Sequence, residues 1–509
     1  MQNKDLPQFP ESFWRNLDFP TFQSLTQDIT VDVAIVGGGI TGITAAYLLS
    51  KQNVKVALIE SGQILTGTTG HTTAKITAQH GLIYDELISH FGIEKAKQYY
   101  DASSQALQFI KNTVSQSQID CDFIEQDAYI YATTDEYAQK IQKEREAYEK
   151  LKISGGPINS IPFDIDIKAG LSMSNQAQFH PTKYLTHLVK ELQKENIQLY
   201  EQTTAVDIED ADGDIPVVVT QSGKRISCKF VIVASHYPFY DGLGFYFTRM
   251  YQERSYVLGV KTDQPYPGGM YISVDDPTRS IRYTPYNGEN LILIGGENHK
   301  TGQGIDTYQH HEALNQFAEK LFPVTGIPYR WSAQDLITLD KVPYIGPITQ
   351  SKQRILIATG YHKWGMTNGT AAAMVLSDFV LGKQNGFLEL YAPSRFEADP
   401  SIKKFTSINA DVAKHLIKGK LEFVPKIPQD VENDEGAVVM INGRRAGGYR
   451  DEKGELHLVD TTCTHLGCEC EWNHAERTWD CPCHGSRFSY TGEVVNGPAL
   501  KPLKVINED

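Results

Sequence analysis

The chain has 509 residues, which is too long for one ordinary hydrophobic core, so we expect two or three domains. Its net charge of −14 argues against nucleic acid and anionic membrane surfaces as partners, because both require a basic face. The N-terminal residues have no signal-like pattern, and no run of 18 apolar residues occurs. We therefore expect no membrane anchor and a cytoplasmic location.

The first 30 residues are polar and contain several proline and aromatic residues, which indicates an irregular N-terminal arm (1–30). The pattern then changes to that of a β-α-β unit. A β-branched run at Val31–Val36 predicts a buried strand, Ile40–Ser50 has the apolar spacing of a helix, and Val54–Ile59 predicts a second strand.

The turn between this strand and helix carries the pattern G-x-G-x-x-G, at Gly37, Gly39 and Gly42. Such glycines permit a tight turn, close approach of the backbone to a pyrophosphate, and packing of helix on strand. Glu60 ends the next strand, where a carboxylate can accept hydrogen bonds from ribose hydroxyls. The alternative is a glycine turn in an ordinary β-α-β unit, but the context favours a dinucleotide site.

Later segments alternate between helix and strand patterns. Tyr184–Asn196 has one apolar helical face, while four short apolar runs predict strands at Val217–Thr220, Phe230–Ala234, Leu291–Ile294 and Ile355–Ala358. This alternation predicts an α/β or α+β domain over residues 31–400.

Residues 401–423 follow this domain and resemble a helical linker. From residue 424 to 509 the sequence favours short strands joined by turns, with Asn442-Gly443 and Lys453-Gly454 as hairpin signals. We therefore predict a separate all-β domain at 424–509.

This second domain contains five of the seven cysteines, within 21 residues, and clustering of that kind favours a metal site. Cys463 and His465 form Cys-x-His, and Cys481 and His484 form Cys-x-x-His. Two thiolates and two imidazoles on paired short loops are the ligands of a Rieske [2Fe–2S] centre. Zinc also binds cysteine and histidine and is the alternative.

The whole segment CTHLGCECEWN…CPCHGSRF closely resembles Rieske proteins of the cytochrome bc type. The resemblance implies that Cys463 and Cys481 bind one iron. It implies that His465 and His484 bind the other iron, with their rings exposed at the tip of the cluster.

The same resemblance implies a disulfide between Cys468 and Cys483, although Cys470 is a rival partner for either thiol. Gly497-Pro498-Ala499 resembles the proline loop that covers such a cluster. Ser486 is similar to the residue that bonds a bridging sulfide, but Phe488 replaces a tyrosine that bonds a cysteine sulfur. Losing that donor lowers the reduction potential, so we predict a potential below that of the tyrosine-containing clusters.

The first domain resembles FAD-dependent oxidoreductases of the D-amino-acid oxidase type over about residues 30–385. The segments that carry this resemblance are ESGQILTGTTGHTTAKIT, FHPTKYLTHLVKEL, TTAVDIE, WSAQDLITLDKVPYIGPI and RILIATGYHKWGMTNGTAAA. The resemblance implies a Rossmann-like FAD domain interleaved with an antiparallel-sheet substrate domain. It also implies flavin contacts from Val206, Gly360, Gly365 and Thr367. No second G-x-G-x-x-G unit is present, so we expect FAD and no separate NADH domain.

Together the two sites predict an oxidoreductase that passes electrons from a small amine, amino acid or hydroxyacid through FAD to the cluster. An external one-electron acceptor or donor completes the relay. Residues expected to line the flavin are His71, Lys75, His362 and Lys363. Candidates for pairing with a substrate carboxylate are Arg254, Arg282 and Arg330, and no single catalytic base is indicated.

Two other functions remain open at this point. The chain could be an electron-transfer adaptor without a small substrate, or a flavin oxidase that uses dioxygen and keeps the cluster for structure. A Rieske oxygenase is disfavoured, because no segment indicates the 2-His-1-carboxylate iron site that those enzymes need.

Overall fold

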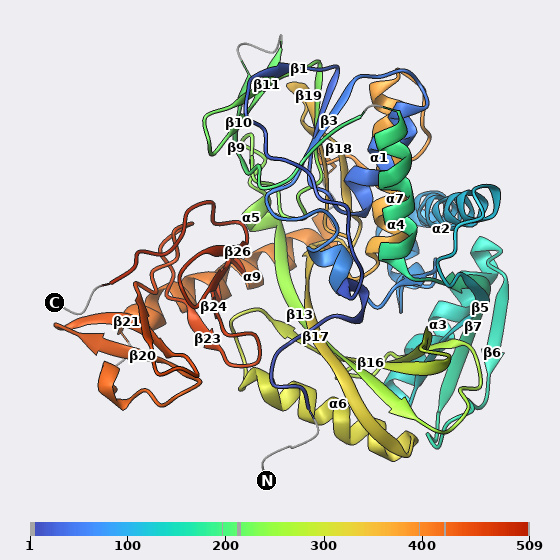
Figure 1. Ribbon diagram of the computed structural model, residues 1–509. Helices are drawn as coiled ribbons and strands as arrows, with labels where there is room; N and C mark the ends of the chain where they lie inside the picture. The colour runs from blue at the N-terminus through green and yellow to red at the C-terminus, as the bar shows by residue number, and fades with distance from the viewer. Residues whose placement is uncertain (1–5, 196, 211–214, 396–397, 422–423, 507–509) are drawn as a thin grey trace.

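The computed structural model describes residues 6–195, 197–210, 215–395, 398–421 and 424–506. A large N-terminal part is built around two sheets, and a smaller part, orange and red in Figure 1, lies against its side. The expected class is confirmed: an α/β unit, an added antiparallel sheet and a C-terminal all-β region. The described helices include none that is long and apolar enough to cross a membrane.

A six-stranded, mainly parallel sheet forms the nucleotide-binding half. Its order is β18 (Tyr344–Thr349), β19 (Lys352–Thr359), β12 (Phe230–Val233), β2 (Val33–Val36), β3 (Val56–Ile59) and β8 (Gln198–Tyr200). Its helices are α1 (Ile40–Ser50), α4 (Pro181–Lys194) and α7 (Gly365–Val380). Every residue of β2 and β3 is buried, as expected for parallel strands covered on both faces. The helix predicted at Ile40–Ser50 is confirmed.

A small sheet lies at the edge of this half. It is ordered β1 (Ile29–Thr30), β11 (Arg225–Ser227), β10 (Pro216–Thr220) and β9 (Ala205–Asp210).

The second large sheet has nine strands and is mostly antiparallel. Its strands are β17 (Val324–Thr338), β13 (Met250–Thr262), β16 (Glu289–Lys300), β15 (Arg279–Tyr286), β14 (Met270–Ser273), β5 (Ile124–Ala132), β7 (Ala169–Gln178), β4 (Lys75–Ile76) and β6 (Gly155–Ile158). The accompanying helices are α2 (Tyr84–Gln116), α3 (Asp135–Leu151) and α6 (Thr307–Leu321). The sequence pattern had not indicated α2 or α3.

The short helix α5 (Tyr246–Arg249) comes directly before β13. The short helix α8 (Leu388–Tyr391) and the long α9 (Ala398–Leu421) lead to the C-terminal domain. This domain has one sheet of β20 (Glu435–Ile441), β21 (Arg444–Arg450) and β22 (Leu456–Val459). Its second sheet contains β23 (Glu471–Asn473), β24 (Thr478–Asp480), β25 (Arg487–Ser489) and β26 (Val494–Asn496). Asn442 and Gly443 both have positive φ and join β20 to β21, as the hairpin signal predicted.

The described part of the N-terminal arm is largely irregular and is packed against both parts of the molecule. Trp14, in the 3-10 turn η1 (Phe13–Arg15), is fully buried, and its indole nitrogen donates to the Thr72 carbonyl at 2.6 Å. Near the start of the arm, Arg477 of the C-terminal domain donates to the Gln8 carbonyl at 3.1 Å. The arm therefore helps to join the two parts.

Candidate functional site

The glycine turn between β2 and α1 has the shape that a pyrophosphate site requires. Gly37 has φ +116°, and a Cβ there would lie 2.4 Å from the Ala234 carbonyl oxygen. A Cβ on Gly42 would lie 2.0 Å from the Gly37 carbonyl oxygen, so α1 packs directly on the turn. Gly39 is the residue before the first turn of α1, where main-chain N–H groups attract phosphate.

Glu60 stands at the end of β3, beside this turn. Its carboxylate accepts hydrogen bonds from the main-chain nitrogens of Gly38 at 2.7 Å and Gly62 at 3.0 Å. One carboxylate oxygen, Oε1, also accepts from the Ser61 hydroxyl at 3.0 Å, whereas Oε2 accepts from Gly38 alone and keeps a lone pair for a ribose hydroxyl. The geometry fits the ribose of a dinucleotide.

A cavity of about 950 Å³ extends from the glycine turn across the nine-stranded sheet. This volume is at the upper end of the roughly 300–1,000 Å³ of ligand pockets. Its walls also include Tyr361–Met366 and, from the C-terminal domain, residues of the segment Glu493–Pro502. The cavity is therefore lined by both parts of the chain.

The residues expected to contact flavin lie at or next to this cavity. Gly365 lines it. Gly360, just before the lining loop, has φ +78°, and the Thr367 hydroxyl is 3.0 Å from the Thr77 carbonyl oxygen. On β9 the lining residue is Ala205, immediately before Val206. The individual flavin contacts stay predictions.

Four titratable candidates, His71, Lys75, His362 and Lys363, all line the cavity. Burial, reinforced by Arg282, lowers the pKa of the Lys75 ammonium to about 7. The Lys363 ammonium instead pairs with a carboxylate on β13, that of Glu253, at 2.9 Å.

Two further cavity residues had escaped the sequence reasoning. Asp335 lies opposite Glu253 in the β13–β17 register, and burial raises its carboxyl pKa to about 6. The His80 ring contacts the Tyr99 hydroxyl at 2.7 Å and stacks on Trp364, and burial lowers its pKa to about 3. Neither residue belongs to a motif, and only the folded sheet and loop bring them to the cavity.

The three candidate arginines take other roles. The Nε atom of Arg254 is 3.9 Å from an Asp480 carboxylate oxygen, and Arg330 donates to the Ala475 carbonyl at 3.1 Å. Both guanidiniums thus face the C-terminal domain, and the structure does not place these two candidates at the cavity wall. Arg282 is buried and donates to the Thr73 carbonyl at 2.6 Å.

The paired loops of the C-terminal domain bring three thiols together. The sulfur atoms of Cys463, Cys470 and Cys481 lie within 4.8 Å of one another, and all three residues are buried. Gly467 has φ +77° and Gly485 has φ +69°, which allows each loop to turn back on its cysteine.

The two predicted histidine ligands meet beside these thiols. The rings of His465 and His484 are 4.9 Å apart and nearly perpendicular. The Nδ1 atom of His465 is buried and has no hydrogen-bond partner within the described residues, although a buried polar atom normally has one. Sulfur donors on one side and an unpaired imidazole nitrogen on the other fit the iron ligands of a Rieske centre.

The tip of these loops is not free in this fold. His484 is only 4% exposed, and the ring of Phe247, from α5, lies 5.7 Å from the His484 ring and 5.8 Å from the His465 ring. The prediction of two exposed imidazoles is therefore wrong for His484, because the flavin-binding part covers the tip.

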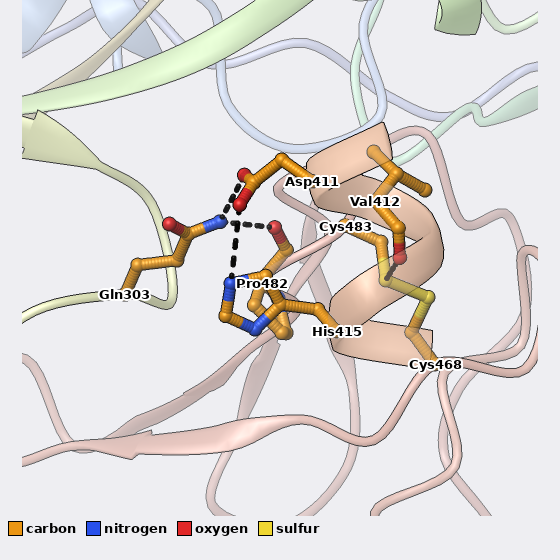
Figure 2. The surroundings of a disulfide bond; sticks show 7 residues. All are labelled: Gln303, Asp411, Val412, His415, Cys468, Pro482 and Cys483. Carbon is orange, nitrogen blue, oxygen red and sulfur yellow. Dashed lines mark hydrogen bonds and ion pairs between the residues drawn. A yellow bond between two sulfur atoms is a disulfide. The ribbon is translucent and has the colours of Figure 1, made fainter. Parts of the chain in front are cut away.

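The structure contains the predicted Cys468–Cys483 disulfide, while the rival thiol, Cys470, is free and buried. Figure 2 shows the disulfide against α9, where the Cys483 sulfur is 3.8 Å from the Val412 carbonyl oxygen. In the same view, Gln303 donates to the Pro482 carbonyl at 3.1 Å. The cluster loop is thus held from both sides.

The residues around the thiols also follow the resemblance. The main-chain nitrogen of Ala499, in the predicted proline loop, donates to the Ser486 hydroxyl at 3.0 Å. Phe488 is fully buried among the cluster cysteines and pairs with Trp479 across β24 and β25. Position 488 therefore offers no hydroxyl that could donate a hydrogen bond to a nearby cysteine sulfur.

On one side of the cavity, a single layer of sheet, β13 with β17, lies between the cavity and the loops that carry His484 and Gly485. On β13, Glu253 lines the cavity while the next residue, Arg254, faces the C-terminal domain. On β17, Ala333 and Asp335 line the cavity while Gln334 donates to the Gly485 carbonyl at 2.9 Å. The two sites thus share a wall.

The family model described as FAD dependent oxidoreductase matches residues 32–379, and that of the Rieske [2Fe-2S] domain matches residues 424–507. The chain belongs to the FAD-dependent oxidoreductase family. Its cofactors are FAD and a Rieske [2Fe–2S] cluster, and it is an oxidoreductase.

Relatives support both assignments. The chain is 53% identical to a protein of Bacillus subtilis (strain 168) named as a Rieske 2Fe-2S iron-sulfur protein, YhfW, and the match covers 98% of each chain. It is 22% identical to gamma-glutamylputrescine oxidoreductase of Escherichia coli (strain K12), over 72% of this chain and 88% of that one. The fold resembles glycine oxidase from Geobacillus kaustophilus, with a TM-score of 0.60, 19% identity and coverage of 72% and 99%.

Proposed function

We propose that this oxidoreductase oxidises a small amine, amino acid or hydroxyacid in the cavity and delivers the electrons to an external one-electron acceptor through the Rieske domain. The observation that carries the proposal is the shared wall of β13 and β17. FAD supplies two-electron chemistry toward the substrate, and the cluster supplies one-electron transfer toward the acceptor.

The ligands in this proposal are Cys463 and Cys481 for one iron and His465 and His484 for the other. The convergence of the sulfur atoms and the unpaired His465 nitrogen support this choice. Cys470 is the third thiol of the group, and we assign it no iron, because two cysteines and two histidines complete a Rieske site.

The cavity offers both kinds of charge to a substrate. Lys75 is a buried amine that can meet a carboxylate, and Asp335 is a buried carboxylate that can meet an ammonium group. Residues of the segment Glu493–Pro502 line the same cavity. These features support a small polar substrate, and the name of the Escherichia coli relative agrees with an amine.

Rapid mixing under anaerobic conditions tests the proposal. Amines, amino acids and hydroxyacids are mixed one by one with the fully loaded protein, while flavin and cluster absorbance are followed together. We expect a true substrate to bleach the flavin first and the cluster afterwards. Flavin bleaching without later cluster reduction would rule out the relay, and a screen without any bleaching would favour the adaptor function.

A further inference from the structure

We propose that Gln334 is the bridge through which electrons cross from the flavin cavity to the cluster loop. This inference rests on the proposed function and adds the route to it. It concerns one side chain on the shared wall, on the strand face opposite the cavity.

The position of Gln334 is well defined by its neighbours. The residues before and after it on β17, Ala333 and Asp335, line the cavity. Its own side chain is 5% exposed and points to the other face of the strand, where its Nε2 atom donates to the Gly485 carbonyl at 2.9 Å. The hydroxyl of Thr301 donates to its Oε1 atom at 3.2 Å, which fixes the orientation of the amide.

The acceptor end of this bond is equally constrained. Gly485 follows the predicted iron ligand His484 directly, so its amide is one peptide unit away from that residue. Gly485 has φ +69°, and a Cβ there would lie 2.7 Å from a Gln252 side-chain carbon, on β13. The loop therefore rests directly on the sheet, and its carbonyl cannot turn away without lifting the loop.

The resulting route contains few gaps. It runs from the cavity wall along the main chain of β17, through the Gln334 side chain and across one hydrogen bond to the Gly485 carbonyl. From there it follows the main chain through the Gly485 Cα and the preceding peptide to His484. Electrons tunnel more readily through covalent and hydrogen bonds than across empty space, so this route favours transfer.

The electron balance is simple. Two-electron-reduced flavin gives up its electrons one at a time and releases its protons to solvent. Each electron converts one ferric ion of the cluster to ferrous. An external one-electron acceptor must then reoxidise the cluster before the second electron follows.

The test compares two glutamines that hold the same ligand loop. Gln334→Met removes the amide but keeps the length of the side chain. Gln303→Met is the matched control, because Gln303 also donates to a carbonyl of this loop, that of Pro482 at 3.1 Å, but lies after β16 on the α9 side. Each loaded variant receives a light pulse under anaerobic conditions in the presence of EDTA, the sacrificial electron donor that reduces the photoexcited flavin, and cluster reduction is followed by absorbance.

We expect Gln334→Met to slow cluster reduction severalfold, with the reduction potentials of both centres and the cluster EPR spectrum unchanged, while Gln303→Met keeps the wild-type rate. Gln334→Leu repeats the test with a different shape if the methionine variant folds poorly. Equal rates in wild type and both Gln334 variants, or equal slowing by Gln303→Met, would overturn the bridge. Absence of cluster reduction in the wild type would instead overturn the relay itself.

Discussion

The flavin cavity and the cluster site are built by different means. The nucleotide end of the cavity is shaped mainly by the main chain: Gly37 turns, Gly42 lets α1 approach, and Glu60 is held by peptide nitrogens. The cluster site is shaped by side chains, with buried thiols and an unpaired ring nitrogen converging on one place. The flavin cavity should therefore lose FAD when a side-chain atom is added to the glycine turn. The cluster site should lose the cluster when a ligand atom is removed.

The largest expected effect is removal of a cluster donor. Cys481→Ser should abolish cluster incorporation, because a hydroxyl is a poor replacement for an iron-bound thiolate. Cys470→Val should retain the cluster, although its sulfur belongs to the same group of three. Iron and sulfide analysis together with EPR of the reduced proteins measures both. Loss of iron in the Cys470 variant would mean that the ligand assignment is incomplete.

Adding one methyl group to the turn tests the other site. In Gly42→Ala the new Cβ would lie 2.0 Å from a main-chain oxygen, so the helix must move off the turn. Overpacking typically costs about 1–3 kcal/mol, and a clash with backbone belongs at the upper end. We expect loss of bound FAD, measured by absorbance after gel filtration, with iron content retained.

The control for this variant is Gly386→Ala, whose Cβ would meet no atom within 4 Å. This variant should bind FAD as wild type does. Full FAD retention by Gly42→Ala would show that the turn is more adaptable than its close contacts indicate.

A third test loosens the boundary between the two sites. Arg254 is 1% exposed and lies near Asp480, which also pairs with Arg487 at 3.1 Å. Removing one member of a buried charge group typically costs about 3–5 kcal/mol. We therefore expect calorimetry to show two thermal transitions for Arg254→Met and one for the wild type. The exposed pair Lys140–Glu136 provides the control, since Lys140→Met should change little.

The same boundary should respond to acid. Burial opposes the charge of Asp480, but Arg487 and Arg254 hold its pKa below the usual carboxyl range. A carboxyl whose pKa is lowered by folding adds stability above its unfolded pKa, and this stability is lost as the pH falls through the folded pKa. Docking should thus weaken only below about pH 4, and Arg254→Met should shift this loss to higher pH.

The smallest effect concerns the potential of the cluster. Phe488→Tyr would place a hydroxyl near the buried cysteines and should stabilise the reduced cluster. A hydrogen bond contributes about 0.5–1.5 kcal/mol, which for a one-electron couple raises the potential by roughly 20–65 mV. Protein-film voltammetry measures this shift, and Phe488→Leu serves as the control. An unchanged potential in the tyrosine variant would remove Phe488 as the reason for a low value.

The parts of the fold that sequence reasoning could predict are local ones. The glycine turn, the helix after it and the carboxylate at Glu60 fall within about 25 residues, and turn chemistry and periodicity determine them. The cluster loops could also be predicted from local sequence, because the cysteine and histidine of each ligand pair are only two or three residues apart. The hairpin at Asn442-Gly443 could also be predicted, because two adjacent residues determine the turn.

What escaped prediction depends on residues far apart in the chain. His484 is buried because Phe247, more than 200 residues earlier, lies over it. Arg254 was one of three candidates for pairing with a substrate, because periodicity cannot tell which face of β13 meets the C-terminal domain. Trp14 belongs to an arm without any regular pattern, yet its contact with Thr72 puts it in the core. In each case a tertiary contact decides the role, and a single sequence does not record it.

Residues of the segment Glu493–Pro502 line the cavity, and this affects how the two domains of the enzyme can be studied separately. The two family matches suggest two domains that could be expressed separately by dividing the chain near α9. A chain ended there would open the cavity on one side and expose the charged Arg254 face of β13 to water. Dioxygen would reach the reduced flavin more easily, so we expect the shortened protein to reduce dioxygen to hydrogen peroxide. The Rieske domain thus also forms part of the wall around the cavity of the flavin-binding domain.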